Sequence, residues 1–381
     1  MKQLKSKLFR QIKKHSTKNI DIYSKPSNGT IISPFAFTID PMEQLMLVNF
    51  EKDPDKFYNI LEFQKACDKD GKKYLLAIAY KTDGTADVFY QDSFPFGAQE
   101  SVLNNAAFYK RPLENAKFEI NPDHITVYFN FEDPMGREIK VQVNESKTQN
   151  KKPFFLLAPV GANSKSPTSL PVYSLYEMSF AKQKYTDIVI EIDNIKHKPD
   201  TFPIPIECSK NYLTRYSADT FNVDWNTNFT GKLYPLIPSI NNTVSDKGIN
   251  YELDKKNNHY EIKCIHASNH KHKINVKFCP AIPDIICLKQ GIELDGNFSI
   301  TTDNAKGNIK GYYRIEKKEN DICLEIKSNK GWTPNEKRWI LKILFYFVKV
   351  FQEWPKTYLW NAKISLNDTT NLYMHSEWKR I

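Results

Sequence analysis

The sequence predicts a mainly β protein, with two antiparallel β-barrel or sandwich domains and one long amphipathic helix near the C-terminus. Two observations lead to this fold class. Short runs of alternating apolar and polar residues recur along the chain with turn residues between them, and only one segment has a clear helical start and stop. The chain has 381 residues, of which 40 % are hydrophobic and 13 % aromatic. This composition supports packed cores, and the length fits two domains.

The clearest strand prediction is Ile125 to Phe131, where every second residue is apolar. A proline and a glycine follow at 133–136, placed as a type I turn favours them, and alternation resumes from Ile139 to Val143. This pattern predicts a β-hairpin. Similar runs predict strands at Tyr74–Tyr80, Ala86–Tyr90, Asp187–Ile192, Tyr260–Ile265, Ile274–Phe278, Phe298–Thr302, Ile309–Ile315, Ile322–Ile326 and Tyr358–Leu366.

The predicted helix spans residues 334–354. Thr333 can cap its first free amides, Pro334 suits the first helical position, and Glu336 can complete a capping box. Pro355 ends it, because proline disfavours helical geometry at the residue before it.

The predicted helix has one narrow polar stripe and is otherwise apolar, so it requires a sheet, a ligand or a membrane surface around most of its girth. We expect packing inside the protein, with Phe345 and Val348 buried, because the stripe is not the broad cationic face of an interfacial helix. The stripe consists of Arg338, Lys342, Lys349 and Glu353.

The chain divides into a basic N-terminal arm at 1–25, a first β-domain at 26–200 and a second at 201–381, with the boundary in the proline-rich stretch 196–205. The net charge is +10, and the arm's eight lysines and arginines less one aspartate contribute 8 − 1 = +7 of it. The body is therefore only weakly basic, which argues against nucleic acid as a partner.

In the arm, Leu4, Leu8, Phe9 and Ile12 recur at helical spacing with lysines between them. This pattern fits either a helix on an anionic membrane or a solvated terminal helix. No apolar segment of signal-peptide type follows the lysines, so we expect a cytoplasmic protein, peripheral to a membrane if the arm binds one. The six cysteines are scattered and form no C-x-x-C pair, which predicts buried thiols rather than a disulfide framework.

The stretch from Gly296 to Ile315, with glycines at 307 and 311, resembles the glycine-punctuated meander of lipocalin-type barrels. Together with the late helix, the second half of the chain is similar to paired calycin-like proteins such as the carotenoid hydratase group. The resemblance implies two β-barrel domains. It carries over no functional residue.

The segment from Tyr212 to Trp225 has the composition of an apolar pocket with a few polar groups that orient a ligand. Its candidate ligand-binding residues are Tyr212, Arg215, Tyr216 and Trp225. Asp219 and Asp224 are the candidate catalytic acids or bases, should burial raise the pKa of either. The alternative is a loop of packed tyrosines with surface ion pairs.

The densest group of candidate metal ligands is Cys264, His266, His270 and His272, which a hairpin could bring together as zinc requires. Its spacing matches no standard zinc module, and neighbouring lysines would repel a cation. We therefore predict no metal and no other cofactor.

The chain lacks the nucleophile elbow of hydrolases, phosphate-binding glycine loops and the H-E-x-x-H motif. Three functions remain open. The first is binding or carriage of an apolar or amphiphilic small molecule, such as a lipid or isoprenoid. The others are an enzyme acting on a lipid, isoprenoid or sugar through dispersed Asp, Tyr and His residues, and a structural or interaction module.

Overall fold

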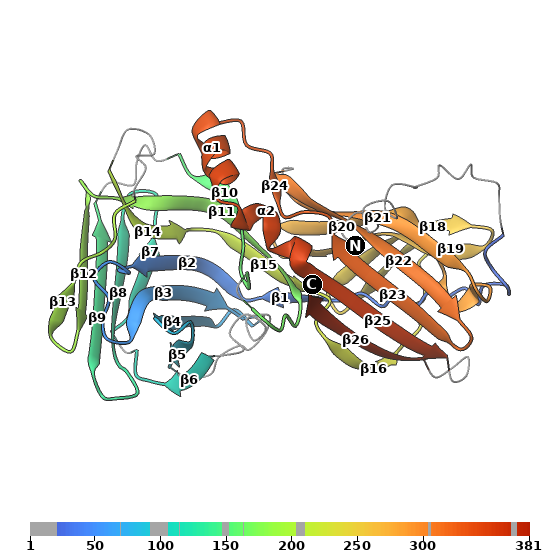
Figure 1. Ribbon diagram of the computed structural model, residues 1–381, viewed down its shortest axis with the longest axis horizontal. Coiled ribbons are helices and arrows are strands. Elements are labelled where there is room, and N and C mark those ends of the chain that lie inside the picture. The colour runs from blue at the N-terminus through green and yellow to red at the C-terminus, as the bar shows by residue number, and fades with distance from the viewer. Residues whose placement is uncertain are drawn as a thin grey trace, which may run out of the picture.

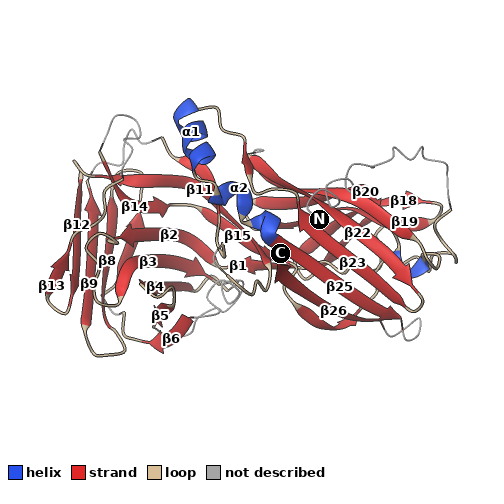
Figure 2. Cartoon of the chain, viewed as in Figure 1, coloured by secondary structure: helices blue, strands red, loops and turns tan. Residues whose placement is uncertain are grey.

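The structure is a computed structural model that describes residues 21–381 except 69, 92–105, 114, 147–151, 163, 203–209, 304–305 and 367–371. It is mainly β, with three sheets and few helices (Figure 2). Each strand that the alternating pattern predicts is present. The predicted hairpin is present too, and a hydrogen bond from the Gly136 amide to the Asp133 carbonyl closes its turn. The prediction that the chain is mainly β is confirmed, whereas the prediction of a long C-terminal helix is not.

The first sheet has ten strands in the order β1-β15-β11-β14-β2-β3-β4-β5-β6, with β10 also paired to β11. Its longest strand, β11, pairs with β14 along one half of its length and with β15 along the other half. Strands β14 and β15 therefore lie end to end beside β11. The strands are β1 (Phe37–Asp40), β2 (Met42–Asn49), β3 (Tyr58–Cys67), β4 (Lys73–Lys81), β5 (Ala86–Tyr90), β6 (Ala106–Lys110), β10 (Phe154–Ala158), β11 (Leu170–Lys182), β14 (Asn211–Ser217) and β15 (Thr220–Trp225).

The second sheet has five strands in the order β13-β12-β9-β8-β7 and packs across the first (Figure 1). Aromatic rings fill the core between these two sheets. Phe63 of β3 lies 4.4 Å from Phe129 of β8, and Phe89 of β5 lies 4.6 Å from Phe131, measured between ring centroids. The strands are β7 (Lys117–Ile120), β8 (Ile125–Glu132), β9 (Glu138–Glu145), β12 (Thr186–Ile192) and β13 (Ile195–His197).

The third sheet has eleven strands and curls into a half-barrel (Figure 1). Apart from β24, which pairs with β22, its order is β16-β26-β25-β23-β22-β21-β20-β19-β18-β17. The strands are β16 (Phe229–Leu233), β17 (Thr243–Asp246), β18 (Ile249–Lys256), β19 (His259–Ser268), β20 (Lys273–Ile282), β21 (Glu293–Thr302), β22 (Gly307–Lys318), β23 (Asp321–Ser328), β24 (Thr333–Pro334), β25 (Tyr358–Leu366) and β26 (Leu372–Arg380).

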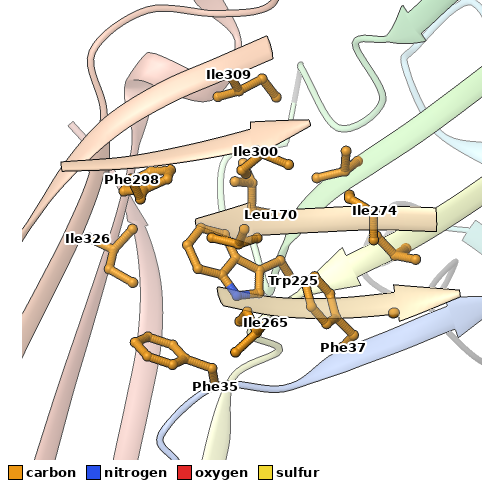
Figure 3. Close-up of a cluster of buried hydrophobic side chains, with 14 of the residues drawn as sticks. Phe35, Phe37, Leu170, Trp225, Ile265, Ile274, Phe298, Ile300, Ile309 and Ile326 are labelled. Atoms are coloured by element: carbon orange, nitrogen blue, oxygen red, sulfur yellow. The ribbon is translucent and has the colours of Figure 1, made fainter. Parts of the chain in front are cut away.

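One hydrophobic core joins the first and third sheets. Phe37, Leu170 and Trp225 of the first sheet point toward Phe298 and the isoleucines of the half-barrel (Figure 3). The Trp225 ring lies 5.3 Å from that of Phe298 and is fully buried. The end of the first sheet is therefore part of the half-barrel core.

The change of sheet comes later in the chain than the predicted domain boundary at 200/201. Strands β14 and β15 follow that boundary and yet belong to the first sheet, and the third sheet begins at Phe229. Part of the proline-rich stretch lies outside the described residues, as do residues 1–20 of the predicted arm and their proposed helix. Tyr23 of the arm is buried against β19 of the third sheet, where its ring stacks on His259 and its hydroxyl donates to Glu261.

The prediction of one long helix over 334–354 is wrong. The structure has the nine-residue α1 (Trp339–Phe347), the four-residue α2 (Val350–Glu353) and short 3-10 turns at Ile285–Cys287 and Pro355–Thr357. Thr333 and Pro334 pair with β22 instead of starting the helix. Glu336 accepts hydrogen bonds from the amides of Lys337 and Arg338, which keeps this segment out of the helix.

Val348 interrupts the helix with non-helical backbone angles, φ −84° and ψ 79°. The chain then packs α2 directly on Gly331, where a Cβ atom would lie 2.2 Å from the backbone carbon of Gln352. Phe345 is buried as predicted, whereas Val348 is only half-buried.

The cysteines at 67, 264, 279, 287 and 323 are free thiols, while Cys208 lies outside the described residues. Cys264 and Cys287 are buried as predicted, whereas Cys279 is exposed. In the part of the chain that the structure describes, no helix is long and apolar enough to cross a bilayer.

Candidate functional site

One face of the first sheet carries charged side chains in a row that is otherwise apolar. Strand pairing places Arg215 of β14 opposite Leu47 of β2, Leu47 opposite Glu62 of β3, and Glu62 opposite Ile78 of β4. Residues directly opposite one another in a sheet share a face. A guanidinium and a carboxylate therefore lie on the same side, separated by one leucine.

The Glu62 carboxylate is buried and accepts two side-chain hydrogen bonds. Gln64 Nε2 donates to Oε1 at 2.5 Å, and the Tyr80 hydroxyl donates to Oε2 at 2.8 Å. Burial raises the pKa of Glu62, although these two bonds and the charge of Arg215 oppose the rise. Burial and the neighbouring carboxylate also raise the pKa of Tyr80 well above its ordinary value.

Arg215 is half-buried, and its Nη1 donates to Oδ1 of Asn49 at 2.6 Å. Burial lowers its pKa, and the charges of Glu62, Tyr80 and Glu51 oppose that shift. Among the described residues, Asn49 is the side chain that accepts from this guanidinium, which has five N–H donors. We call Asn49, Glu62, Gln64, Tyr80 and Arg215 the Arg215–Glu62 cluster.

Apolar side chains continue the same face beyond Glu62. Leu76, Ile78, Ala86 and Val88 form a small separate core, and Tyr80, Tyr90, Ala106 and Phe108 pack partly buried against it. Val88 lies opposite Ile78 and beside Phe108. A few hydrogen-bonding groups beside apolar and aromatic surface are the usual composition of a small-molecule site.

A second polar cluster lies where the first sheet meets the third. His272 Nε2 is 2.9 Å from Asp219 Oδ2, and His272 Nδ1 is 2.8 Å from Asp303 Oδ2. The Tyr176 ring of β11 stacks on the imidazole at 3.7 Å, nearly parallel to it. We call Tyr176, Asp219, His272 and Asp303 the His272 cluster.

The geometry of the His272 cluster suits a structural contact between the first and third sheets better than a proton-transfer site. Both ring nitrogens face carboxylates, and both can donate only when the ring is protonated. A general base needs a free nitrogen toward its substrate, and neither nitrogen of His272 is free. Asp219 is also engaged, since Lys271 Nζ lies 3.8 Å from its other oxygen.

The predicted residues of the 212–225 segment do not converge on one site. Arg215 belongs to the Arg215–Glu62 cluster, whereas Tyr216 is buried in the core between the first two sheets. Trp225 lies in the half-barrel core and Asp224, also fully buried, lies opposite Thr38 of β1. Tyr212 is half-buried and forms an isolated antiparallel bridge with Thr201.

The four candidate metal ligands are also dispersed. His272 is held by two carboxylates, His266 Nδ1 lies 3.9 Å from Glu252, and His270 is exposed. Cys264 is buried, and burial raises its pKa to about 11, which keeps the thiol protonated. Metals bind the thiolate.

The donor atoms that do lie close together among the described residues are those of His259, Asp284 and Cys287, all within 4.8 Å of one another. His259 Nδ1 is 3.1 Å from Asp284 Oδ2, and the Tyr23 ring stacks on the imidazole at 3.6 Å. Burial raises the pKa of Cys287 to about 12. Direct hydrogen bonding and stacking account for this group.

A surface crevice of about 550 Å³ lies at one end of the second sheet. Its polar lining includes His124, Asn144, Glu145 and Lys184. Glu145 is buried, and its charge contributes to the raised pKa of Tyr216. The crevice is open to solvent, so it lacks the enclosure of a typical ligand site.

Sequence reasoning missed Glu62, Gln64, Tyr80, Tyr176 and Asp303. Glu62 and Gln64 lie on β3, Tyr80 on β4, Tyr176 on β11 and Asp303 directly after β21. No local motif therefore joins them to Arg215 or His272. One signal was available in β3, where Glu62 stands between the apolar residues Leu61 and Phe63 of a strand that is buried on both faces.

No family model matches this chain, and no curated protein or solved structure proved similar to it. The function must therefore be argued from the site.

Proposed function

We propose that this protein binds or carries an amphiphilic small molecule of the lipid or isoprenoid kind on the Arg215–Glu62 face of the first sheet. The observation that carries the proposal is the half-buried guanidinium of Arg215, which lies on a face that is otherwise mainly apolar. Among the described residues, its side-chain acceptor is the amide oxygen of Asn49. Burying charged groups without full pairing costs free energy, so such groups are commonly retained for a ligand.

The polar end of the ligand carries oxygen acceptors. Arg215 offers remaining donors in a planar arrangement that matches a carboxylate or another pair of oxygens. Glu62, whose pKa burial raises, can donate a hydrogen bond in its protonated form. The apolar body of the ligand packs on the half-buried side chains of Leu47, Tyr80 and Phe108.

Two measurements test the proposal. Native mass spectrometry of protein purified from its host should reveal a bound amphiphile, and oleate should raise the melting temperature of the full chain. Arg215→Gln should abolish the oleate shift, whereas Arg314→Gln should keep it, because Arg314 is an exposed arginine of the third sheet paired with Glu293.

Should Arg215→Gln fold poorly, Arg215→Lys keeps the charge and removes the planar donor pair, so a weakened oleate shift is expected. Protein without bound mass, and unshifted by any member of a panel of fatty acids, sterols and isoprenoids, would overturn the proposal.

A further inference from the structure

Helix α1 has one buried side and one exposed apolar side. Leu341 and Phe345 are buried, and the Phe345 ring lies 5.1 Å from Trp332. On the other side Trp339, Tyr346 and Phe347 are 69, 72 and 70 % exposed. Figure 1 shows α1 standing out from the junction of the first and third sheets.

This exposed side forms a patch of aromatic and aliphatic side chains. Ile343 and Val350, 44 and 38 % exposed, extend it, so five large apolar residues are exposed within twelve positions. Single exposed apolar residues are ordinary on soluble proteins, but a contiguous group of this kind marks a surface that binds something.

The charges around the patch are positive. Lys337, Lys342 and Lys349 are exposed in the same segment, and among the described residues Lys342 and Lys349 take part in no ion pair. The two acids of the segment are already engaged, Glu336 with Arg338 at 2.9 Å and Glu353 with Lys356 at 3.4 Å.

The size of the patch also indicates its partner. A nine-residue helix is about 14 Å long and about 10 Å wide, so one side of it covers roughly 140 Å². Each side of a stable protein interface buries far more, about 800 Å². Tryptophan and tyrosine favour the interfacial region of bilayers, and each nearby lysine adds about 1 kcal/mol of attraction to anionic lipid.

We propose that α1 docks this protein on an anionic lipid surface, with Trp339, Tyr346 and Phe347 entering the headgroup region and the lysines contacting lipid phosphates. Phe345 and Leu341 anchor the helix to the body from its other side. The inference depends on the surface of α1 and is independent of the Arg215–Glu62 cluster.

The tryptophans provide a site-specific test. Five of the six, at 225, 332, 354, 360 and 378, are at most 5 % exposed, so Trp339 is the solvent-accessible reporter. Vesicles of equal parts phosphatidylcholine and phosphatidylserine should shift its emission to shorter wavelength and protect it from acrylamide. Trp339→Phe should remove this change in fluorescence.

Tyr346→Ser with Phe347→Ser should weaken co-sedimentation with these vesicles by about tenfold or more. Ile237→Ser with Ile240→Ser is the matched control, because those residues are 79 and 98 % exposed on another segment and should not contribute. High salt should weaken wild-type binding.

Three outcomes would overturn the inference. The first is vesicle binding with unchanged Trp339 emission, as binding through the N-terminal arm alone would give. The second is equal vesicle binding by the wild type and the Tyr346/Phe347 variant. The third is a stable dimer that already shields Trp339 in solution, which would make α1 an interface between copies.

Discussion

Phe345→Ala is expected to lower the stability of this protein strongly, although α1 stands at the edge of the fold. The Phe345 ring is 2 % exposed and lies among aromatic rings, with centroids 5.1 Å from Trp332, 5.8 Å from Phe351 and 6.2 Å from Phe154. Phe154 belongs to β10 of the first sheet and Trp332 precedes β24 of the third, so the ring connects α1 to both.

The expected loss is about 3–5 kcal/mol, because truncation removes the transfer free energy of a buried ring and leaves a cavity that rigid neighbours cannot fill. Phe347→Ala provides a control of the same residue type on the same helix. Its ring is 70 % exposed, so its removal should change stability by no more than about 0.5 kcal/mol.

Urea denaturation followed by far-ultraviolet circular dichroism would measure both values. Equal stability of the two variants, or a Phe345→Ala loss below about 1 kcal/mol, would refute the assignment of a buried and an exposed side to α1. The opposite ranking is expected for vesicle binding. Phe347→Ala, the more stable variant, should bind anionic vesicles more weakly than Phe345→Ala.

Two further predictions concern charged groups. The Arg338 guanidinium and nearby amides hold the pKa of Glu336 at about 2, below its ordinary 4.5, so its stabilisation is complete above pH 4.5 and disappears as the pH falls toward 2. Because this ion pair is partly exposed and its charges are screened by solvent, the unfolding free energies of wild type and Glu336→Gln, compared by thermal melting, should differ by about 1 kcal/mol near neutral pH, and the difference should vanish in acid. Asp219→Asn should lower stability in urea by about 1–3 kcal/mol through the lost charged contact to His272, whereas Lys271→Ala, 57 % exposed, should have little effect. An unchanged urea midpoint in Asp219→Asn would show that this contact does not hold the sheets together.

Local patterns in the sequence were sufficient for the strands and the hairpin turn. Alternation from Ile125 to Phe131 predicts β8 because every second residue must face a core, whatever that core turns out to be. The same local reasoning overestimated the helix. Thr333 and Glu336 carry good helix-start chemistry, yet the first pairs with β22 and the second binds Arg338.

The candidate site was only partly predictable, for a related reason. Arg215 was identified as a candidate because it stands among aromatics, but its partners Asn49 and Glu62 are more than 150 residues away in the chain. Similarly, Asp219 and His272 were each selected for separate roles, and only the structure brings them within 2.9 Å of one another.

The sequence by itself determined that this protein is mainly β, where many of its strands run and which short turns connect them, because these depend on residues that are neighbours in the chain. Only the tertiary structure decided that β14 and β15 belong to the first sheet, that the helix is short, and that its aromatic side faces solvent. Strand order and exposure depend on contacts between distant segments, and the free energy of those contacts exceeds the local preferences of the residues involved.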